Sequence, residues 1–182
     1  MKMSLPDEAS HDKNYVVQEE FDDKAGRYDH YRLAKWYQAQ GKCVLRQIEN
    51  VEGQVVDVGC GTGWLLRRLI HRHPSATGIG IDLSKRMIEE AKKQTLKEGL
   101  DRCIFIHGNW ENLESRKHIM KQLDAPVSLV TCVSVFHYFR YPEQAVRSMY
   151  ESLDYGGRLL LLDRAMDGSF GTIIWDMLHR YI

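Results

Sequence analysis

The chain has 182 residues, and its 25 Lys and Arg balance its 25 Asp and Glu, so the formal net charge is zero. This balance gives no electrostatic reason to expect a nucleic-acid partner. The sequence has no apolar run of the roughly 20 residues that span a bilayer, and its N-terminus lacks the apolar core of a signal peptide. We therefore expect a cytoplasmic protein without a membrane partner.

The N-terminal part predicts a flexible segment over 1–14, followed by a single domain over 15–182. Between residues 15 and 50, aromatic and aliphatic side chains recur at three- and four-residue steps. This spacing predicts one or two amphipathic helices, with a break near Ala25-Gly26.

The stretch 55–63, VVDVGCGTG, predicts a buried strand and a glycine-rich turn, with a helix beginning at Trp64. The amides at that helix N-terminus would point at whatever lies over the turn. A dinucleotide fingerprint, G-x-G-x-x-G, would need its third glycine at Trp64. Here the third glycine is Gly63, and Asp57 stands two residues before the first.

A second buried strand is predicted over 76–81 and a third over 102–107. Asp82 ends the second, about 20 residues beyond the glycine turn, where a carboxylate meets ribose hydroxyls in nucleotide-binding folds. Ser84 is a natural N-cap for a helix over 85–100. None of the four cysteines belongs to a C-x-x-C pair, so we expect reduced, buried thiols and no metal site.

The C-terminal half predicts a surface helix over 114–123, a central strand over 127–135 and a fifth strand over 158–162. Pro142 opens the helix between these two strands. The stretch 169–182 reads as a further amphipathic helix. Strands that alternate with helices predict an α/β fold with a doubly wound, mostly parallel sheet.

Several of these stretches together resemble the class I S-adenosylmethionine-dependent methyltransferases of small-molecule type, including those of quinone biosynthesis. VVDVGCGTG matches their D-x-G-x-G-x-G motif, GIDLSKRMIEEAK their second motif, and FDDKAGRYDHY an F-D-x-x-A-x-x-Y-D element before the first strand. The resemblance covers about residues 21–163 and implies a Rossmann-like fold with S-adenosylmethionine as cofactor. It implies cofactor contacts from Tyr28, Asp57, Gly59, Gly61, Gly63, Asp82, Leu83, Met87, Asn109, Trp110 and Val133.

The resemblance assigns roles to some of these residues. Tyr28 would help to cover the cofactor, with packing between helices as the open alternative. Asp82 would bind the ribose, and Met87 would line the adenine pocket or belong to the core. Asn109 stands where the family usually has Asp, and its side-chain carbonyl could still accept a hydrogen bond from the adenine amine. The amide of Trp110 could reach the adenine ring.

The implied reaction is transfer of a methyl group to a small organic acceptor by in-line displacement. His137, at the exit of the fourth strand, is the candidate catalytic residue because imidazole can take a proton near neutral pH. Packing beside the cofactor is its alternative role. The alternative function is a catalytically silent subunit that binds S-adenosylmethionine and serves in regulation or as a scaffold.

The family's sheet usually has seven strands, and we expect the last two to be absent here. Either the chain is truncated at its C-terminus or another element covers the open edge of 158–162. The candidates are the predicted helix 169–182, the N-terminal segment, or a second copy in a homodimer. Trp175, Leu178 and Tyr181 would form the apolar face of that helix.

Overall fold

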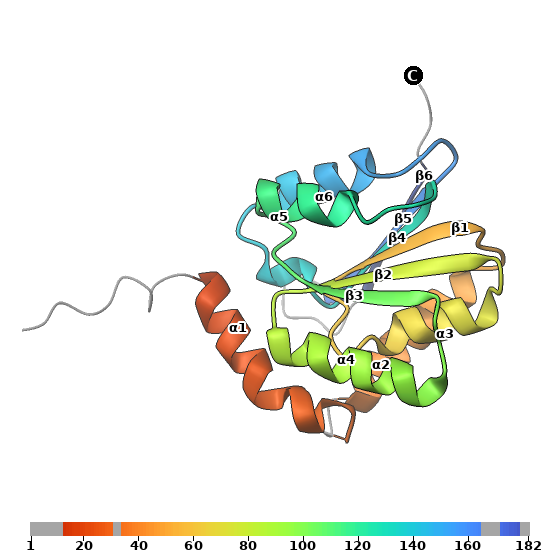
Figure 1. Ribbon diagram of the computed structural model, residues 1–182. Helices are drawn as coiled ribbons and strands as arrows, with labels where there is room; N and C mark the ends of the chain where they lie inside the picture. The colour runs from red at the N-terminus through yellow and green to blue at the C-terminus, as the bar shows by residue number, and fades with distance from the viewer. Residues whose placement is uncertain (1–12, 31–33, 165–171, 179–182) are drawn as a thin grey trace, which may run out of the picture.

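A six-stranded sheet in the order β3-β2-β1-β4-β5-β6 organises the computed structural model (Figure 1). The structure describes residues 13–30, 34–164 and 172–178. Strands β1 to β5 are parallel, and β6 is antiparallel to β5. The predicted doubly wound, mostly parallel sheet is confirmed. The strands are β1 (Gly53–Val58), β2 (Ala76–Asp82), β3 (Cys103–His107), β4 (Val127–Val133), β5 (Arg158–Arg164) and β6 (Thr172–Leu178).

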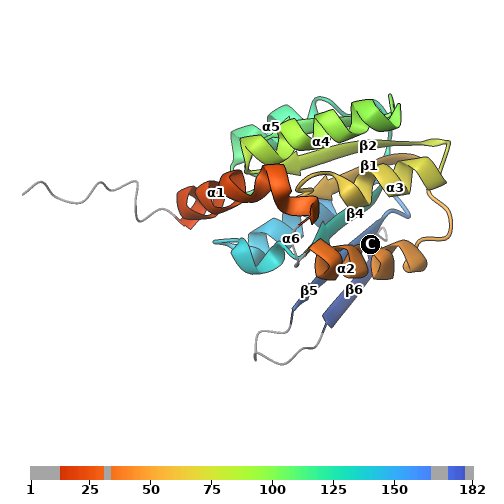
Figure 2. The ribbon, with the colours of Figure 1, turned by 90° about the horizontal axis from the view of Figure 1, so that it is seen from below.

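Helices cover both faces of the sheet: α2, α3 and α4 lie on one face, and α5 and α6 on the other (Figures 1 and 2). The helices are α1 (Lys13–Lys24), α2 (Ala34–Gln47), α3 (Trp64–Arg72), α4 (Lys85–Glu98), α5 (Leu113–Met120) and α6 (Pro142–Glu151), with short 3-10 turns η2 (Ala25–His30) and η3 (Phe136–Tyr138). The predicted break at Ala25-Gly26 is confirmed. The predicted flexible segment 1–14 extends too far, since Lys13 and Asn14 belong to α1, and 1–12 lie outside the described residues.

Each face of the sheet buries its own apolar core. Successive side chains of a strand point to opposite faces, so a strand covered on both sides must be apolar throughout. In β1, Val55 packs with the cluster beneath α2, α3 and α4, while Val56 packs with the cluster beneath α5 and α6. In β5, Leu160 and Leu161 divide in the same way. This explains the long apolar runs of the central strands.

The C-terminal segment departs from its prediction. Residues 172–178 form a strand, not part of a helix, and pair along the whole of β5 from Arg158↔Leu178 to Arg164↔Thr172. The segment TIIWDML is rich in β-branched and aromatic residues, which suit a strand. The open backbone groups of β5 supply its pairing partner. The expected absence of both late strands is therefore wrong for one of them.

Pairing with β6 confirms the wider prediction that the edge of β5 is covered, although a strand covers it in place of the expected helix. Trp175 and Leu178 belong to this strand, so they do not form the expected apolar face of a helix. Tyr181 lies outside the described residues. The β5 edge is therefore paired within the chain, and 172–178 is a strand, so neither is the contact surface expected for a homodimer. A homodimer itself remains a prediction. None of the helices in the described ranges is long and apolar enough to cross a membrane.

Candidate functional site

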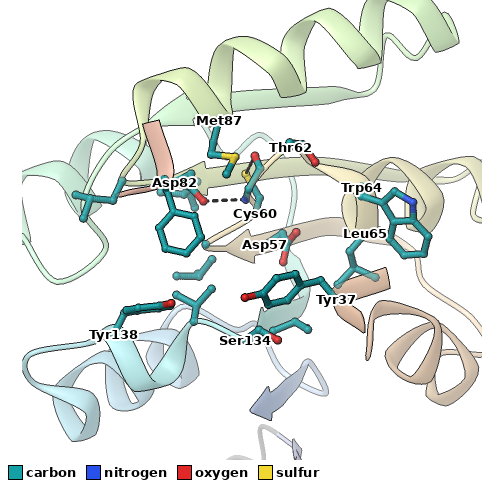
Figure 3. Close-up of a pocket in the computed structure, with 18 of the residues that line it drawn as sticks. Tyr37, Asp57, Cys60, Thr62, Trp64, Leu65, Asp82, Met87, Ser134 and Tyr138 are labelled. Carbon is teal, nitrogen blue, oxygen red and sulfur yellow. Dashed lines mark hydrogen bonds between the residues drawn. The ribbon is translucent and has the colours of Figure 1, made fainter. Parts of the chain in front are cut away.

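A cleft lies at the carboxyl ends of the strands, and residues of α1, η2 and α2 also line it. Figure 3 shows a part of its lining. Its empty volume is about 1210 Å³, which includes open space at its mouth. The lining comes from the ends of β1, β2 and β4 and from the turn that follows β1. Strand β1 lies between β2 and β4, so the chain leaves β1 and β4 in opposite directions at this point. Open α/β sheets bind ligands where the strand order reverses in this way.

The turn after β1 is built on three glycines with positive φ: Gly59 (73°), Gly61 (54°) and Gly63 (73°). A Cβ on Gly59 would lie 2.3 Å from Cγ2 of Val135, and one on Gly63 would lie 2.5 Å from the ring of Phe105. A Cβ on Gly61 would meet nothing within 4 Å. Gly61 is therefore the glycine that leaves room in the cleft, whereas Gly63 does not line it and serves close packing at the start of α3.

Asp82 connects the glycine turn to the start of α4. Its Oδ2 accepts from the amide of Gly61 at 2.8 Å, and its Oδ1 accepts from the amide of Ser84 at 2.8 Å. The predicted N-cap is confirmed, because the side chain of Ser84 accepts from the amide of Met87. Burial raises the pKa of the Asp82 carboxyl to about 6, although both amide hydrogen bonds oppose this change.

Asp57 lies deeper, at the end of β1, and is only 3% exposed. Its Oδ1 accepts from the hydroxyl of Thr131 on β4 at 2.7 Å. Burial raises the pKa of Asp57 to about 7, and the negative charge of Asp82 adds to the rise. Asp57 also lines the cleft, so a carboxyl group that is about half protonated at pH 7 faces the candidate ligand space.

We expect Asp57→Asn to unfold less readily than the native protein at pH 8 in the absence of ligand. The folded-state pKa lies above the unfolded value, so the stability due to Asp57 is complete at low pH and is lost as the pH rises through about 7. Asparagine carries no such charge and can still accept from Thr131. In urea unfolding at pH 8, the free energy of unfolding of Asp57→Asn should exceed that of the native protein by about 1–3 kcal/mol. At pH 5 the gain should shrink, and an equal difference at both pH values would contradict this reading.

The loop after β3 brings Asn109 and Trp110 to the cleft, as expected. The Oδ1 of Asn109 accepts from the amide of Glu111 at 2.9 Å, so it helps to close the loop. The indole of Trp110 is buried in the cluster beneath α5 and α6 and donates to the hydroxyl of Ser148 at 3.0 Å. Contact of either residue with an adenine ring remains a prediction.

Aromatic side chains from the N-terminal elements and from η3 form one half of the cleft. Phe21 of α1 packs edge-on against Tyr138 of η3, with ring centroids 5.4 Å apart. Tyr28 of η2 stacks on Tyr37 of α2 at 5.5 Å. All four residues line the cleft, and Figure 3 shows the hydroxyls of Tyr37 and Tyr138 directed toward the same space. Tyr37 was missed in the sequence, where it is one of many aromatic residues at helical spacing.

The loop after β4 contains the one described non-glycine residue with a positive φ, Ser134 at 60°. This conformation ends β4 at Val133, two residues earlier than predicted. The hydroxyl of Ser134 donates to the side-chain oxygen of Gln40 on α2. Ser134 and Val133 both line the cleft. Left-handed non-glycine residues are uncommon and concentrate at functional sites.

His137 is not among the residues that line the cleft. Its Nδ1 lies 2.8 Å from Oδ1 of Asp163 at the end of β5, and its backbone amide donates to Oδ2 of the same carboxylate at 3.2 Å. The sequence analysis missed Asp163, although an acidic residue at the end of a predicted strand was a usable signal. The catalytic role of His137 remains a prediction.

Within the described part of the chain, all ionisable side chains of the cleft lining that carry a charge near neutral pH are acidic. The lining includes four carboxyl side chains and no Lys, Arg or His. The carboxyl groups are those of Asp29, Asp57, Asp82 and Glu111. Nearby, the ammonium group of Lys13 donates to the backbone carbonyls of Phe139 and His137. Such a lining attracts a cation and disfavours an anion.

Of the residues expected at the cofactor, all but Gly63 line this one cleft. They come from five different parts of the chain, and the fold brings them together at the ends of the strands. The lining residues are Tyr28, Asp57, Gly59, Gly61, Asp82, Leu83, Met87, Asn109, Trp110 and Val133.

Comparison with known proteins agrees with this geometry. A family model described as a methyltransferase domain matches residues 55–157. The chain is 29% identical over 168 residues to a malonyl-[acyl-carrier protein] O-methyltransferase of Priestia megaterium, covering 90% of this chain and 54% of that protein. It is 27% identical over 170 residues to the ubiquinone/menaquinone biosynthesis C-methyltransferase UbiE of Desulfotalea psychrophila, covering 90% and 64%.

Solved structures share the fold. An S-adenosylmethionine-dependent methyltransferase of Geobacter sulfurreducens, solved with S-adenosyl-L-homocysteine, superposes with a TM-score of 0.57 at 22% identity. The superposition covers 78% of this chain and 54% of that protein. The chain thus spans little more than half the length of the first curated relative and of this structural neighbour.

Proposed function

The chain belongs to the S-adenosylmethionine-dependent methyltransferases, and from this premise we propose that it transfers the methyl group of that cofactor to a small organic acceptor. The observation that carries the proposal is the acidic cleft over the glycine turn. S-adenosylmethionine bears a sulfonium, an ammonium and a carboxylate group, so its net charge is positive. When bound, it supplies a methyl group on a sulfonium that is already a good leaving group.

The cleft residues fit this cofactor better than a dinucleotide. Gly61 leaves open space beside the backbone of the turn, where the methionine part of the cofactor would lie. Asp82, Leu83 and Met87 line the same cleft. Asp82 would hold the ribose, and the side chains of Leu83 and Met87 would form the adenine walls. A dinucleotide would bring its negative pyrophosphate to the same turn, against the carboxyl groups of Asp57 and Asp82 and no cationic side chain in the described lining.

The N-terminal helix supports the proposal by closing the cleft from two sides. Asp22 of α1 accepts from the amide of Arg86 and from the hydroxyl of Ser84 at the start of α4. The preceding residue, Phe21, contacts Tyr138 on the opposite rim. Helix α1 therefore bridges the two rims, which would exclude water and hold an acceptor in place. Such positioning can supply several kcal/mol to a displacement reaction.

We do not assign the reaction a required base. Proton removal is needed only when the acceptor is an acidic carbon, a hydroxyl or a protonated amine. For such acceptors His137 remains the proposed base. A proton on Nδ1 would be held by the carboxylate of Asp163, which leaves Nε2 to accept one.

We expect S-adenosylmethionine to bind more tightly as the pH rises from 5.5 to 7.5, by about 3- to 10-fold. Ionisation of Asp82 near pH 6 and of Asp57 near pH 7 places negative charge beside the cation. S-adenosylhomocysteine lacks the sulfonium charge but carries the same amino group, so it serves as the matched control and should gain less. Isothermal titration calorimetry with both ligands at each pH measures the difference.

Three outcomes of these titrations separate the candidate functions. Tight binding of NAD without a response to either sulfur ligand would refute the proposal. Cofactor binding without methyl transfer to a broad panel of small molecules would favour the catalytically silent subunit. Cofactor binding with transfer of a labelled methyl group to one class of acceptor would support the enzyme.

A further inference from the structure

We propose that the aromatic half of the cleft is the acceptor site, and that its acceptor is a flat, uncharged molecule such as a hydroxylated aromatic ring. This site comprises Phe21, Tyr28, Tyr37, Tyr138 and Phe139 and is called the aromatic chamber. The inference rests on the proposed function, because an acceptor site has meaning only beside the cofactor. It names the acceptor chemistry, which the family assignment leaves open.

The walls of the aromatic chamber come from three separate segments that meet over the strand ends. Helix α1 directs one of its faces into the cleft, since Asn14, Val17 and Phe21 follow at steps of three and four residues and all line it. The stacked pair Tyr28 and Tyr37 forms a second wall. Tyr138 and Phe139 form the third. Aromatic faces and edges arranged in this way pack best on another flat ring.

The hydroxyl groups of the chamber are suited to an uncharged polar partner. Burial raises the pKa of Tyr28 far above its usual value, and the neighbouring Tyr37, Asp82 and Tyr138 add to the rise. The phenol of Tyr28 therefore stays protonated, so it can both donate and accept a hydrogen bond. A hydroxyl or carbonyl oxygen on the acceptor would satisfy such a group without bringing a charge into the cleft.

An anionic acceptor would find no counter-charge among the described lining residues. Burying a carboxylate without a cationic partner is costly. The ammonium group of Lys13 lies beside the lining residue Phe139, but Lys13 is exposed and donates to two backbone carbonyls.

A cationic acceptor would lie beside the cationic sulfonium, which repels it and which already occupies the negative field of the lining. The other two carboxylates of the lining are held by hydrogen bonds within the protein. Asp29 accepts from the hydroxyl of Thr62 at 2.8 Å. Glu111 accepts from the amides of Arg140 and Tyr141. An uncharged ring avoids both penalties.

Calorimetry tests the inference on protein saturated with sinefungin, an S-adenosylmethionine analogue that carries an ammonium group in place of the methylated sulfonium and transfers no methyl group. Three probes of the same ring system are titrated at pH 7.5. These are 2-naphthol, 2-naphthoate and 2-naphthylmethylammonium, which are neutral, anionic and cationic. We expect naphthol to bind at least about tenfold more tightly than either charged probe. Equal or tighter binding of a charged probe would overturn the inference, as would no binding of naphthol up to its solubility limit.

Two variants locate the probe. Tyr138→Leu should weaken naphthol binding by roughly 2- to 12-fold, the worth of one aromatic contact, while Tyr138→Phe should retain most of it. Gln38→Lys, at a half-buried position that lines the cleft, should shift the preference toward naphthoate. Tyr155→Leu, on an exposed turn away from the cleft, is the control that should change neither. If Gln38→Lys leaves the preference for naphthol over naphthoate unchanged, the aromatic chamber is not the binding site of the probe. The same follows if Tyr155→Leu and Tyr138→Leu lose equal affinity for naphthol.

The first titration separates this inference from the proposed function. A protein that binds neither sinefungin nor S-adenosylhomocysteine fails the proposed function itself. A protein that binds it, yet prefers naphthoate or the ammonium probe, fails only the inference about the acceptor.

Discussion

Replacing Gly63 with alanine is expected to lower the free energy of unfolding by about 2–4 kcal/mol. Gly63 has a φ of 73° and stands at the N-cap of α3. This left-handed conformation is energetically unfavourable for a residue that has a Cβ atom. The added Cβ would also lie 2.5 Å from the ring of Phe105 and 3.3 Å from Cβ of Ala91. Because these distances are too short, α3 would have to move away from β3 and α4. Urea unfolding followed by circular dichroism measures the loss.

Gly61→Ala is the matched control, two residues away in the same turn. Its φ of 54° carries a similar backbone cost, but the added Cβ would meet nothing within 4 Å. We expect it to lose only about 1 kcal/mol of stability. Its methyl group would project into the ligand space, so S-adenosylhomocysteine should bind more weakly. If both variants unfold at the same urea concentration, the packing role assigned to Gly63 is incorrect.

The sequence predicts the five parallel strands well because each is a local signal. A strand covered on both faces needs a continuous apolar run, and β1, β4 and β5 all have one. Strand β6 lacks such a signal. Its Trp175 and Leu178 are three residues apart, which fits a helix as well as an edge strand, and only the open edge of β5 decides between the two. The early end of β4 was also missed, because the left-handed conformation of Ser134 has no signature in the sequence.

The residues of the site also differ in whether a local pattern in the sequence indicates them. The glycine turn and Asp82 belong to motifs in which neighbouring residues already imply the geometry, and both are found where expected. The contact between Phe21 and Tyr138 joins residues far apart in the chain, so no local pattern could indicate it. The carboxylate of Asp163 holds His137 across 26 residues, a pairing that depends on β4 and β5 lying side by side. Sequence patterns thus reveal the half of the cleft proposed for the cofactor better than the half proposed for the acceptor.

Asp82→Ala should weaken the binding of S-adenosylhomocysteine by about 3 kcal/mol or more, roughly a hundredfold. Two effects add in this variant. The ribose would lose its hydrogen-bond acceptor, worth about 1.5–3 kcal/mol for a charged group. The amide of Gly61, now held at 2.8 Å by Oδ2, would also lose its partner, so the turn beneath the ligand would no longer be fixed. Calorimetry measures the affinity, and urea unfolding shows how much of the fold is affected.

Ser84→Ala separates loss of the ligand contact from general damage to this corner of the fold. It removes the side-chain cap of Met87 and the contact with Asp22, which should cost about 1 kcal/mol of stability. Asp82 keeps both of its amide partners in that variant, so the affinity for S-adenosylhomocysteine should change less than threefold. If Asp82→Ala binds as well as Ser84→Ala does, the ribose does not lie at Asp82. The reason is that both variants disturb the start of α4, and only one of them removes the carboxylate that also holds the glycine turn.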